Sequence, residues 1–136
     1  MAQLLAYLAF NGNCKEAMEF YKGCFEGELI LMTHGQSPMA AQAPPELRDK
    51  IMHSSLQISG KMVLMGADSM GGEEYKHGNA NSLCLVCESK AEIERLFSRL
   101  SAGGRVAYPL KEEFFGTYGQ LTDKYGFGWM FQFGGS

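Results

Sequence analysis

The order of predicted elements repeats along this chain, and this repeat constrains the fold more than any other feature. A strand, a helix and three further strands are predicted between about residues 3 and 67, and again between about 80 and 134. Residues 68–79, rich in glycine and charge, are predicted to link the two copies. Repetition of this size indicates one structural unit used twice. We therefore predict an α+β fold in which two tandem βαβββ modules, with curled mixed sheets, form a single domain over residues 1–136. A ferredoxin-like fold is the rival, but it leaves the linker unexplained.

In the first copy the helix carries the clearest signals. Asn13 and Glu16 are spaced as an N-cap and its capping-box partner, and Gly27 is expected to end the helix. One apolar stripe, typical of a helix that covers a sheet, is formed by Cys14, Ala17, Met18, Tyr21, Cys24 and Phe25. The strands are predicted at Leu4–Phe10, Glu28–His34, Ile51–Ser59 and Lys61–Ala67, and residues 35–49 are predicted to form a loop with one short helical turn at Pro45–Asp49.

The second copy ends in a hairpin. Asp123 can hydrogen-bond its own turn backbone and Gly126 can adopt a positive φ, so a tight turn is predicted at residues 123–126. The strands are predicted at Asn81–Cys87, Arg105–Pro109, Thr117–Thr122 and Phe127–Phe133. The helix is predicted to begin after Ser89, with Glu92 as capping-box partner, and to bury Ile93, Leu96, Phe97 and Leu100.

Composition and charge exclude several classes of function. Of the 136 residues, 46% are hydrophobic and 20% are charged, as in ordinary soluble globular domains. The net charge of −3 comes from scattered residues, so no basic surface for nucleic acid is predicted. No stretch approaches the ~18 apolar residues of a membrane span, and the N-terminus has no basic lead. We therefore expect a cytoplasmic protein with neither nucleic-acid nor membrane partners.

The four cysteines agree with a reducing compartment. Cys84 and Cys87 lie three residues apart on a predicted strand, so their side chains should point to opposite faces and cannot chelate one metal ion. A second CxxC pair, as a zinc knuckle would need, is absent from the sequence. We expect Cys14, Cys24, Cys84 and Cys87 to be buried, reduced thiols.

Three segments, together with the repeat, resemble a known group of proteins. They are YLAFNGNCKEAMEFY (Tyr7–Tyr21), KMVLMGAD (Lys61–Asp68) and YGQLTDKYGFGWMF (Tyr118–Phe131). The chain is similar over nearly its whole length to the vicinal oxygen chelate superfamily, which includes glyoxalase I, bleomycin-resistance proteins, fosfomycin-resistance enzymes and extradiol dioxygenases. Within it, the chain most resembles the PhnB-like branch. The resemblance implies that the two sheets curl into a cup, and that subunits pair as a homodimer.

Metal-dependent members of this superfamily place His, Gln or Glu ligands on the first and fourth strands of each module. The positions that match here are Ala6, Leu64 or Met65, Ser82 and Met130. A thioether is a soft ligand and a neutral hydroxyl a weak one, so these residues suit a hard divalent ion poorly. Their neighbours also lack His and carboxylates, so a one-residue error in register does not restore the set. We therefore predict that the usual metal site is lost and that no cofactor is held, with a divalent metal as the alternative.

His53 and Glu113 are the candidate catalytic residues. His53 should share a strand face with Ser55 and Gln57, and this face is either solvent-facing or lines a cavity; a histidine suits proton transfer near neutral pH. Glu113, beside Glu112 at the mouth of the last hairpin, can act as a base, pair with a cationic ligand or remain a solvated loop charge.

A ligand pocket is predicted in the cup, lined by His53, Leu64, Ser82, Cys84, Phe115, Tyr118 and Met130. Gly128, Met130 and Gln132 should face it, while Trp129, Phe131 and Phe133 pack under the helices. Aromatic and methionine side chains suit an apolar or planar ligand. A nucleophilic Cys84 would need a neighbouring cation, which the local sequence does not supply. His34 and His77 are expected to be solvated.

Three functions follow from these expectations. The first is a dimeric small-molecule binding protein without metal. The second is a metal-dependent lyase or isomerase of glyoxalase type with an unusual ligand set, such as His53 with Glu113 and Asp68. The third is an oligomer with a vestigial site. Some PhnB-like proteins carry a methyltransferase label, but the usual Rossmann-type enzyme needs a glycine-rich turn that Asn11-Gly12-Asn13 does not provide.

Overall fold

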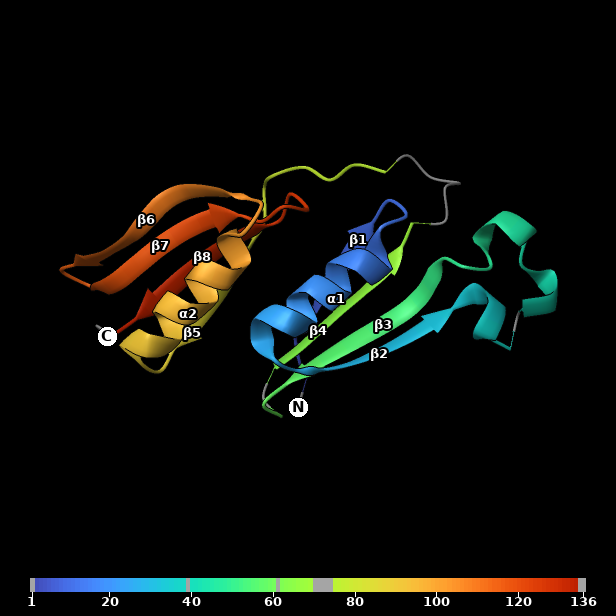
Figure 1. Cartoon of the computed structure of the whole chain (residues 1–136), viewed down its shortest axis with the longest axis horizontal. Coiled ribbons are helices and arrows are strands. Elements are labelled where there is room, and N and C mark those ends of the chain that lie inside the picture. Colours follow the sequence, from blue (N-terminus) through green and yellow to red (C-terminus); the bar gives the residue numbers. More distant parts are fainter. Residues whose placement is uncertain (1, 39, 61, 70–74, 135–136) are drawn as a thin grey trace. The chain divides into compact units, whose positions relative to one another are not determined.

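The structure, a computed structural model, describes residues 2–38, 40–60, 62–69 and 75–134. The chain divides into two compact units, Met1–Lys76 and His77–Ser136. In each unit one α-helix lies across one face of a four-stranded sheet (Figure 1). Both sheets mix parallel and antiparallel pairs, which confirms the predicted α+β fold of two βαβββ modules. In the described part of the chain, no helix has both the length and the apolar character needed to cross a membrane.

The first unit contains β1 (Ala6–Phe10), α1 (Cys14–Phe25), β2 (Glu28–Thr33), β3 (Ile51–Ile58) and β4 (Met62–Asp68). Its strand order is β1-β4-β3-β2, with β1 parallel to β4 and the other neighbours antiparallel. Between β2 and β3 the chain forms three short 3-10 turns, η1 (His34–Gln36), η2 (Ala40–Gln42) and η3 (Pro45–Leu47). Of these, only η3 lies where a helical turn was predicted.

The second unit contains β5 (Ser82–Cys87), α2 (Lys90–Ser101), β6 (Arg105–Glu113), β7 (Gly116–Thr122) and β8 (Gly128–Phe133). Its order, β5-β8-β7-β6, repeats that of the first unit, again with the first and last strands parallel. β6 is longer than predicted because it continues through Pro109 to Glu113. Proline is tolerated there since β6 is an edge strand, and the pairing shifts on both sides of Tyr108.

Each core lies between the helix and one sheet face. The two predicted helical stripes are buried as expected. Across from them the sheets bury Phe10, Leu56 and Leu64 in the first unit and Leu121, Trp129 and Phe131 in the second. Burying one large apolar side chain contributes about 1.5–3 kcal/mol. Because strand side chains alternate, the other face of each sheet carries a second set of residues, which we call its open face.

The start of α1 differs from the prediction. Asn13 makes no capping bond with its side chain. Instead Asp68, predicted to begin the linker, is the last residue of β4 and is buried. Its carboxylate accepts the backbone N–H of Cys14 at 3.0 Å and that of Ile51 at 2.8 Å. A carboxylate at a helix N-terminus satisfies an otherwise unpaired donor and interacts favourably with the helix dipole, so the cap comes from a distant strand.

The end of α1 also differs. Glu26, not Gly27, adopts the left-handed conformation, with φ of 55°. Gly27 is required for a different reason, since an added Cβ would lie 2.5 Å from the backbone oxygen of Gln57. Glu26 is therefore the residue that ends the helix, and Gly27 is needed because the chain there passes close to β3.

The predicted turn of the last hairpin is confirmed and is stronger than the sequence indicated. Gly126 has a positive φ of 94°. The buried Asp123 carboxylate accepts the backbone N–H groups of Tyr125 (2.8 Å) and Phe127 (3.1 Å). It also accepts the indole N–H of Trp129 at 2.8 Å, so one side chain fixes both the turn and the main aromatic residue of the core.

Candidate functional site

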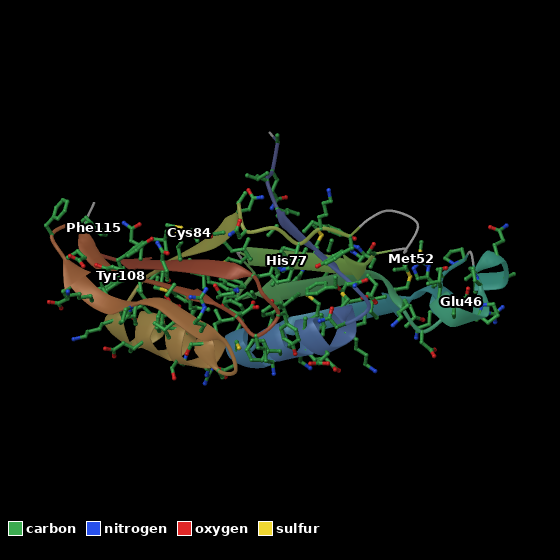
Figure 2. All side chains as sticks on the ribbon, turned by 90° about the horizontal axis from the view of Figure 1, so that it is seen from above. Glu46, Met52, His77, Cys84, Tyr108 and Phe115 are labelled. Atoms are coloured by element: carbon green, nitrogen blue, oxygen red, sulfur yellow. The ribbon has the colours of Figure 1, made fainter. Side chains whose placement is uncertain are left out.

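The open face of the second sheet gathers most of the predicted pocket residues. The strand register places Cys84 of β5 beside Met130 of β8, Met130 beside Gln120 of β7, and Gln120 beside Tyr108 of β6. These four residues form one row across the sheet. Figure 2 shows Cys84 and Phe115 on the side of this sheet that lies away from α2. As predicted, the alternation on β8 buries Trp129 and Phe131 towards α2.

Neighbouring rows complete this face. Tyr118 pairs with Gln132, and Ser82 pairs with Gly128. Ser82 and Cys84 are exposed, while Tyr118 and Met130 are half-buried. The structure therefore brings together five of the seven predicted pocket residues, Ser82, Cys84, Phe115, Tyr118 and Met130. The other two, His53 and Leu64, belong to the first unit.

Aromatic rings gather where β6 and β7 meet. Tyr118 contacts Tyr108 edge-on, with 5.8 Å between ring centroids, and contacts Phe115 in the same way at 5.7 Å. Phe114, which is fully exposed, packs edge-on against Phe115 at 5.1 Å. Edge-to-face contacts of this kind stabilise a defined arrangement of rings. The side-chain amide of Gln120 donates a hydrogen bond to the hydroxyl of Tyr118, which further fixes that ring.

Glu113 lies beside these rings. The hydroxyl of Tyr108 donates a hydrogen bond of 2.6 Å to the Glu113 carboxylate. This hydrogen bond, and then the negative charge of Glu113, raise the pKa of Tyr108 above its usual 10.0. The phenol therefore stays protonated near neutral pH and continues to donate. Glu113 pairs with Gly116 across the hairpin, whereas Glu112 pairs with Thr117 and so points to the opposite face.

The cysteines of β5 differ as the strand geometry predicts. Cys84 is an exposed thiol on the open face, which corrects the expectation that all four cysteines are buried. Cys87 is buried, and burial raises its pKa to about 11. Cys14 is also buried; its pKa is raised to about 11 by burial, and its Sγ lies 3.6 Å from the hydroxyl of Ser54. The two thiols of the CxxC pair therefore lie on opposite faces, as the sequence predicts.

His53 lies on the open face of the first sheet. Its Nδ1 is 3.3 Å from the hydroxyl of Tyr7, and the two rings pack at 6.0 Å between centroids. Leu64 is buried on the helix side of this sheet, whereas Met65, the alternative at that position, pairs with Tyr7 and Ser55 on the open face. The face predicted for His53 and Ser55 is therefore the half-buried side of β3, opposite the buried Ser54 and Leu56.

The residues at the superfamily's metal positions do not fit a metal ion. Among the described residues, no group of three His, Cys, Asp or Glu side chains is placed to hold one. Asp68, considered with His53 as an alternative ligand, points to the helix side of the first sheet and binds two backbone N–H groups. His53 faces the opposite way, and Glu113 belongs to the other unit.

The prediction that His34 is solvated is wrong, because this residue is buried. Its position at the start of η1 fixes its backbone, since its N–H donates to the carbonyl of Lys50 at 3.0 Å. Its Nε2 makes no hydrogen bond within the described part of the chain. His77 packs against Phe127, with 4.4 Å between ring centroids.

A shallow cavity of about 390 Å³ lies at the N-terminal end of α1. Its lining includes charged residues of both signs, among them Lys15, Lys50, Glu16 and Asp49. The Asp68 carboxylate already occupies the helix N-terminus there.

Comparison with known proteins identifies the family. The model of the family called 3-demethylubiquinone-9 3-methyltransferase matches residues 2–132. Protein YjdN of Escherichia coli is 29% identical over 93% of this chain and 92% of its own length. Protein PA1353 of Pseudomonas aeruginosa is 37% identical over all of both chains, with a TM-score of 0.88. A PhnB protein from Bacillus cereus is 26% identical over 98% of this chain and 100% of its own, with a TM-score of 0.78.

The chain belongs to this PhnB-like family. Its fold is that of the vicinal oxygen chelate superfamily. A glyoxalase/bleomycin resistance protein/dioxygenase domain from Frankia, 15% identical over 98% of this chain and 92% of its own, has the same fold with a TM-score of 0.68. The methyltransferase name of the family is not matched by a Rossmann fold, because neither sheet is a doubly wound parallel sheet.

Sequence reasoning missed three residues of these faces: Tyr7, Tyr108 and Gln120. The predicted strand of Tyr108 ends at Pro109, so the sequence does not show how near Tyr108 lies to Glu113. Tyr7 and Gln120 give no signal of their own in the sequence, because each occurs in an ordinary alternating strand. The available signal was the alternation itself, which places Gln120 on the same face as Tyr118.

Proposed function

We propose that this PhnB-like protein binds an organic small molecule on the open face of its second sheet. The observation that carries the proposal is the row formed by Cys84, Met130, Gln120 and Tyr108, flanked by Tyr118. It combines apolar surface with several hydrogen-bonding groups, the usual composition of a ligand site. The half-buried methionine and the fixed rings favour a ligand with a planar, apolar body.

Homodimerisation and a cytoplasmic location belong to the same proposal. Apolar side chains on the open face of the first sheet are well exposed within one chain, with Ile30 at 67% and Tyr7 at 52%. A second subunit would cover such residues and protect the sheet edges. Light scattering at micromolar concentration tests this expectation, and a monomer there would contradict it.

Ligand screening tests the binding site. The full-length protein is melted with a set of planar aromatic compounds, anionic, neutral and cationic. A ligand at a hundredfold excess over its Kd should stabilise the native state by about 2.7 kcal/mol. Met130→Glu places a charge in the row and should abolish the shift. Met65→Glu is the matched control, because Met65 has the same place on the open face of the first sheet and its variant should respond like the wild type.

Two outcomes would overturn the binding proposal. If Met65→Glu loses the shift and Met130→Glu keeps it, the ligand binds the first sheet. If the untagged protein instead contains near-stoichiometric metal by mass spectrometry, the metal-dependent enzyme replaces the binding protein. Loss of that metal in His53→Ala or Glu113→Gln would then identify its ligands.

A further inference from the structure

One end of the second sheet's open face combines aromatic rings with a single carboxylate. The group consists of Tyr108, Phe115, Tyr118 and Glu113, and we call it the aromatic–carboxylate cluster. Tyr118 lies between the other two rings, with centroid distances of 5.8 Å and 5.7 Å. Tyr108 holds the carboxylate at 2.6 Å. All four residues come from β6, β7 and the turn between them, so the cluster is complete within one unit.

The electrostatics of the cluster favour a positive ligand. The faces of aromatic rings carry partial negative charge and attract cations. Glu113 adds a full negative charge, and an ionised carboxylate can accept further hydrogen bonds at its second oxygen. Because the phenol of Tyr108 stays protonated near neutral pH, it fixes this carboxylate by donating to it.

We propose that the aromatic–carboxylate cluster selects an organic cation, a molecule whose charged nitrogen is attached to an aromatic or other apolar body. The inference rests on the proposed function and names the class of ligand for that site. Rings over such a nitrogen interact with its charge, while the neighbouring Met130 row receives the apolar body.

A metal cation fits this cluster poorly. Calcium takes six to eight oxygen ligands, and magnesium demands a near-ideal octahedron. The cluster supplies one carboxylate and two phenols, and no metal-binding group of three acidic, His or Cys side chains occurs among the described residues. An organic cation needs no such coordination, because ring faces and one counter-charge are sufficient.

The positive charge of Lys111 provides a further test of the ligand class. It pairs with Tyr118 across β6 and β7, so it places a positive charge at the edge of the cluster. That charge opposes the binding of a cation. Lys111→Gln should therefore increase cation affinity, the opposite of what it would do to an anion site.

Binding of three related probes tests the ligand class. Titration calorimetry of the full-length protein compares N-methylquinolinium with quinoline, which is neutral in mildly alkaline buffer, and with quinoline carboxylate. We expect the cation to bind roughly tenfold more tightly than its neutral counterpart. Glu113→Gln keeps the acceptor for Tyr108 but removes the charge, so it should lose this preference. Glu112→Gln is the matched control with the same charge change on the opposite face, and it should keep the preference.

Two further variants separate the ring contribution from the charge. Tyr118→Leu should lower the affinity for the cation more than the affinity for quinoline. Lys111→Gln should raise the affinity for the cation only. One outcome would show that the site exists but that the ligand class is wrong. In it, quinoline and the cation bind with equal affinity, Met130→Glu abolishes the binding of both, and Glu113→Gln has no effect. If none of the three probes binds, the inference fails, and the compound screen alone then decides the proposed function.

Discussion

The two sheets of this protein have the same order and bury the same kind of face, yet their open faces differ. The middle row of the first reads Tyr7, Met65, Ser55 and Ile30. The corresponding row of the second reads Cys84, Met130, Gln120 and Tyr108. The first face has a Tyr–His pair among aliphatic residues, whereas the second has clustered rings, a thiol and a carboxylate. The repeat therefore preserves the core, and the chemistry differs where no helix constrains it.

The two units also differ in how the chain crosses from the second to the third strand. In the first unit, three 3-10 turns separate β2 from β3. In the second, β6 and β7 are joined directly at Glu113 and Gly116, whose φ is 119°. The tight connection is what places Phe115 beside Tyr118 and Glu113 within reach of Tyr108. A longer loop there would separate the rings from the carboxylate.

Thiol labelling should separate the two units most strongly. At neutral pH the Cys84 thiol of the native protein should react orders of magnitude faster than the other three thiols, because those are buried. Mass spectrometry should show one label per chain, and none in Cys84→Ser. A native wild type that takes no label would mean that another subunit covers the open face.

Labelling of the buried thiols Cys14 and Cys87 should require alkaline pH. The pKa of Cys14 and that of Cys87 are raised from 9.0 to about 11, so folding favours the neutral thiol. This contribution to stability is complete below pH 9.0 and is lost as the pH rises towards about 11. Labelling of these residues should therefore increase over that range in parallel with the loss of native circular dichroism.

Removing the two buried carboxylates compares how each unit is fixed. Asp123→Ala leaves two backbone N–H groups and the indole N–H of Trp129 without their acceptor, and should cost about 3 kcal/mol or more. Asp68→Ala leaves two backbone N–H groups unpaired and should cost about 2 kcal/mol. Urea denaturation measures both. Equal losses would show that the Trp129 bond adds nothing.

The smallest expected difference between the two units is the loss of stability when each helix cap residue is removed. Ser89 accepts the backbone N–H of Glu92 at 3.1 Å, so Ser89→Ala should cost about 1 kcal/mol. Asn13→Ala should change the free energy of unfolding by at most a few tenths of a kcal/mol, since its side chain makes no capping bond. A loss at Asn13 as large as that at Ser89 would contradict the assignment of the α1 cap to Asp68.

Features fixed by local pattern could be predicted from the sequence. Strand alternation correctly placed Met130 and Cys84 on one face and Trp129 on the other, and turn chemistry located Gly126. Features that depend on distant segments could not. The cap of α1 was assigned to Asn13 because only neighbouring residues can be weighed in a sequence, while the true acceptor, Asp68, follows 54 residues after Cys14. The backbone of His34 is likewise held by a hydrogen bond to Lys50, across the loop.

The site could be predicted in part for the same reason. Five of the predicted pocket residues share one face because that face follows from the period of the strands. The partnership of Tyr108 with Glu113 depends on where β6 ends and on the pairing shifts around Tyr108. A proline signals the end of a central strand but is harmless on an edge strand, and the sequence does not show which strand is the edge.

The distant cap of α1 has a consequence for synthesis of the chain. The start of this helix leaves the ribosome 54 residues before the carboxylate that binds it. The same carboxylate also accepts the backbone N–H at the start of β3. The starts of α1 and β3 therefore lack their hydrogen-bond acceptor until β4 has emerged. The second helix, by contrast, carries its cap in the residue that directly precedes it. The cap of the first helix must therefore wait for the last strand of its unit, whereas the cap of α2 is present as soon as that helix is made.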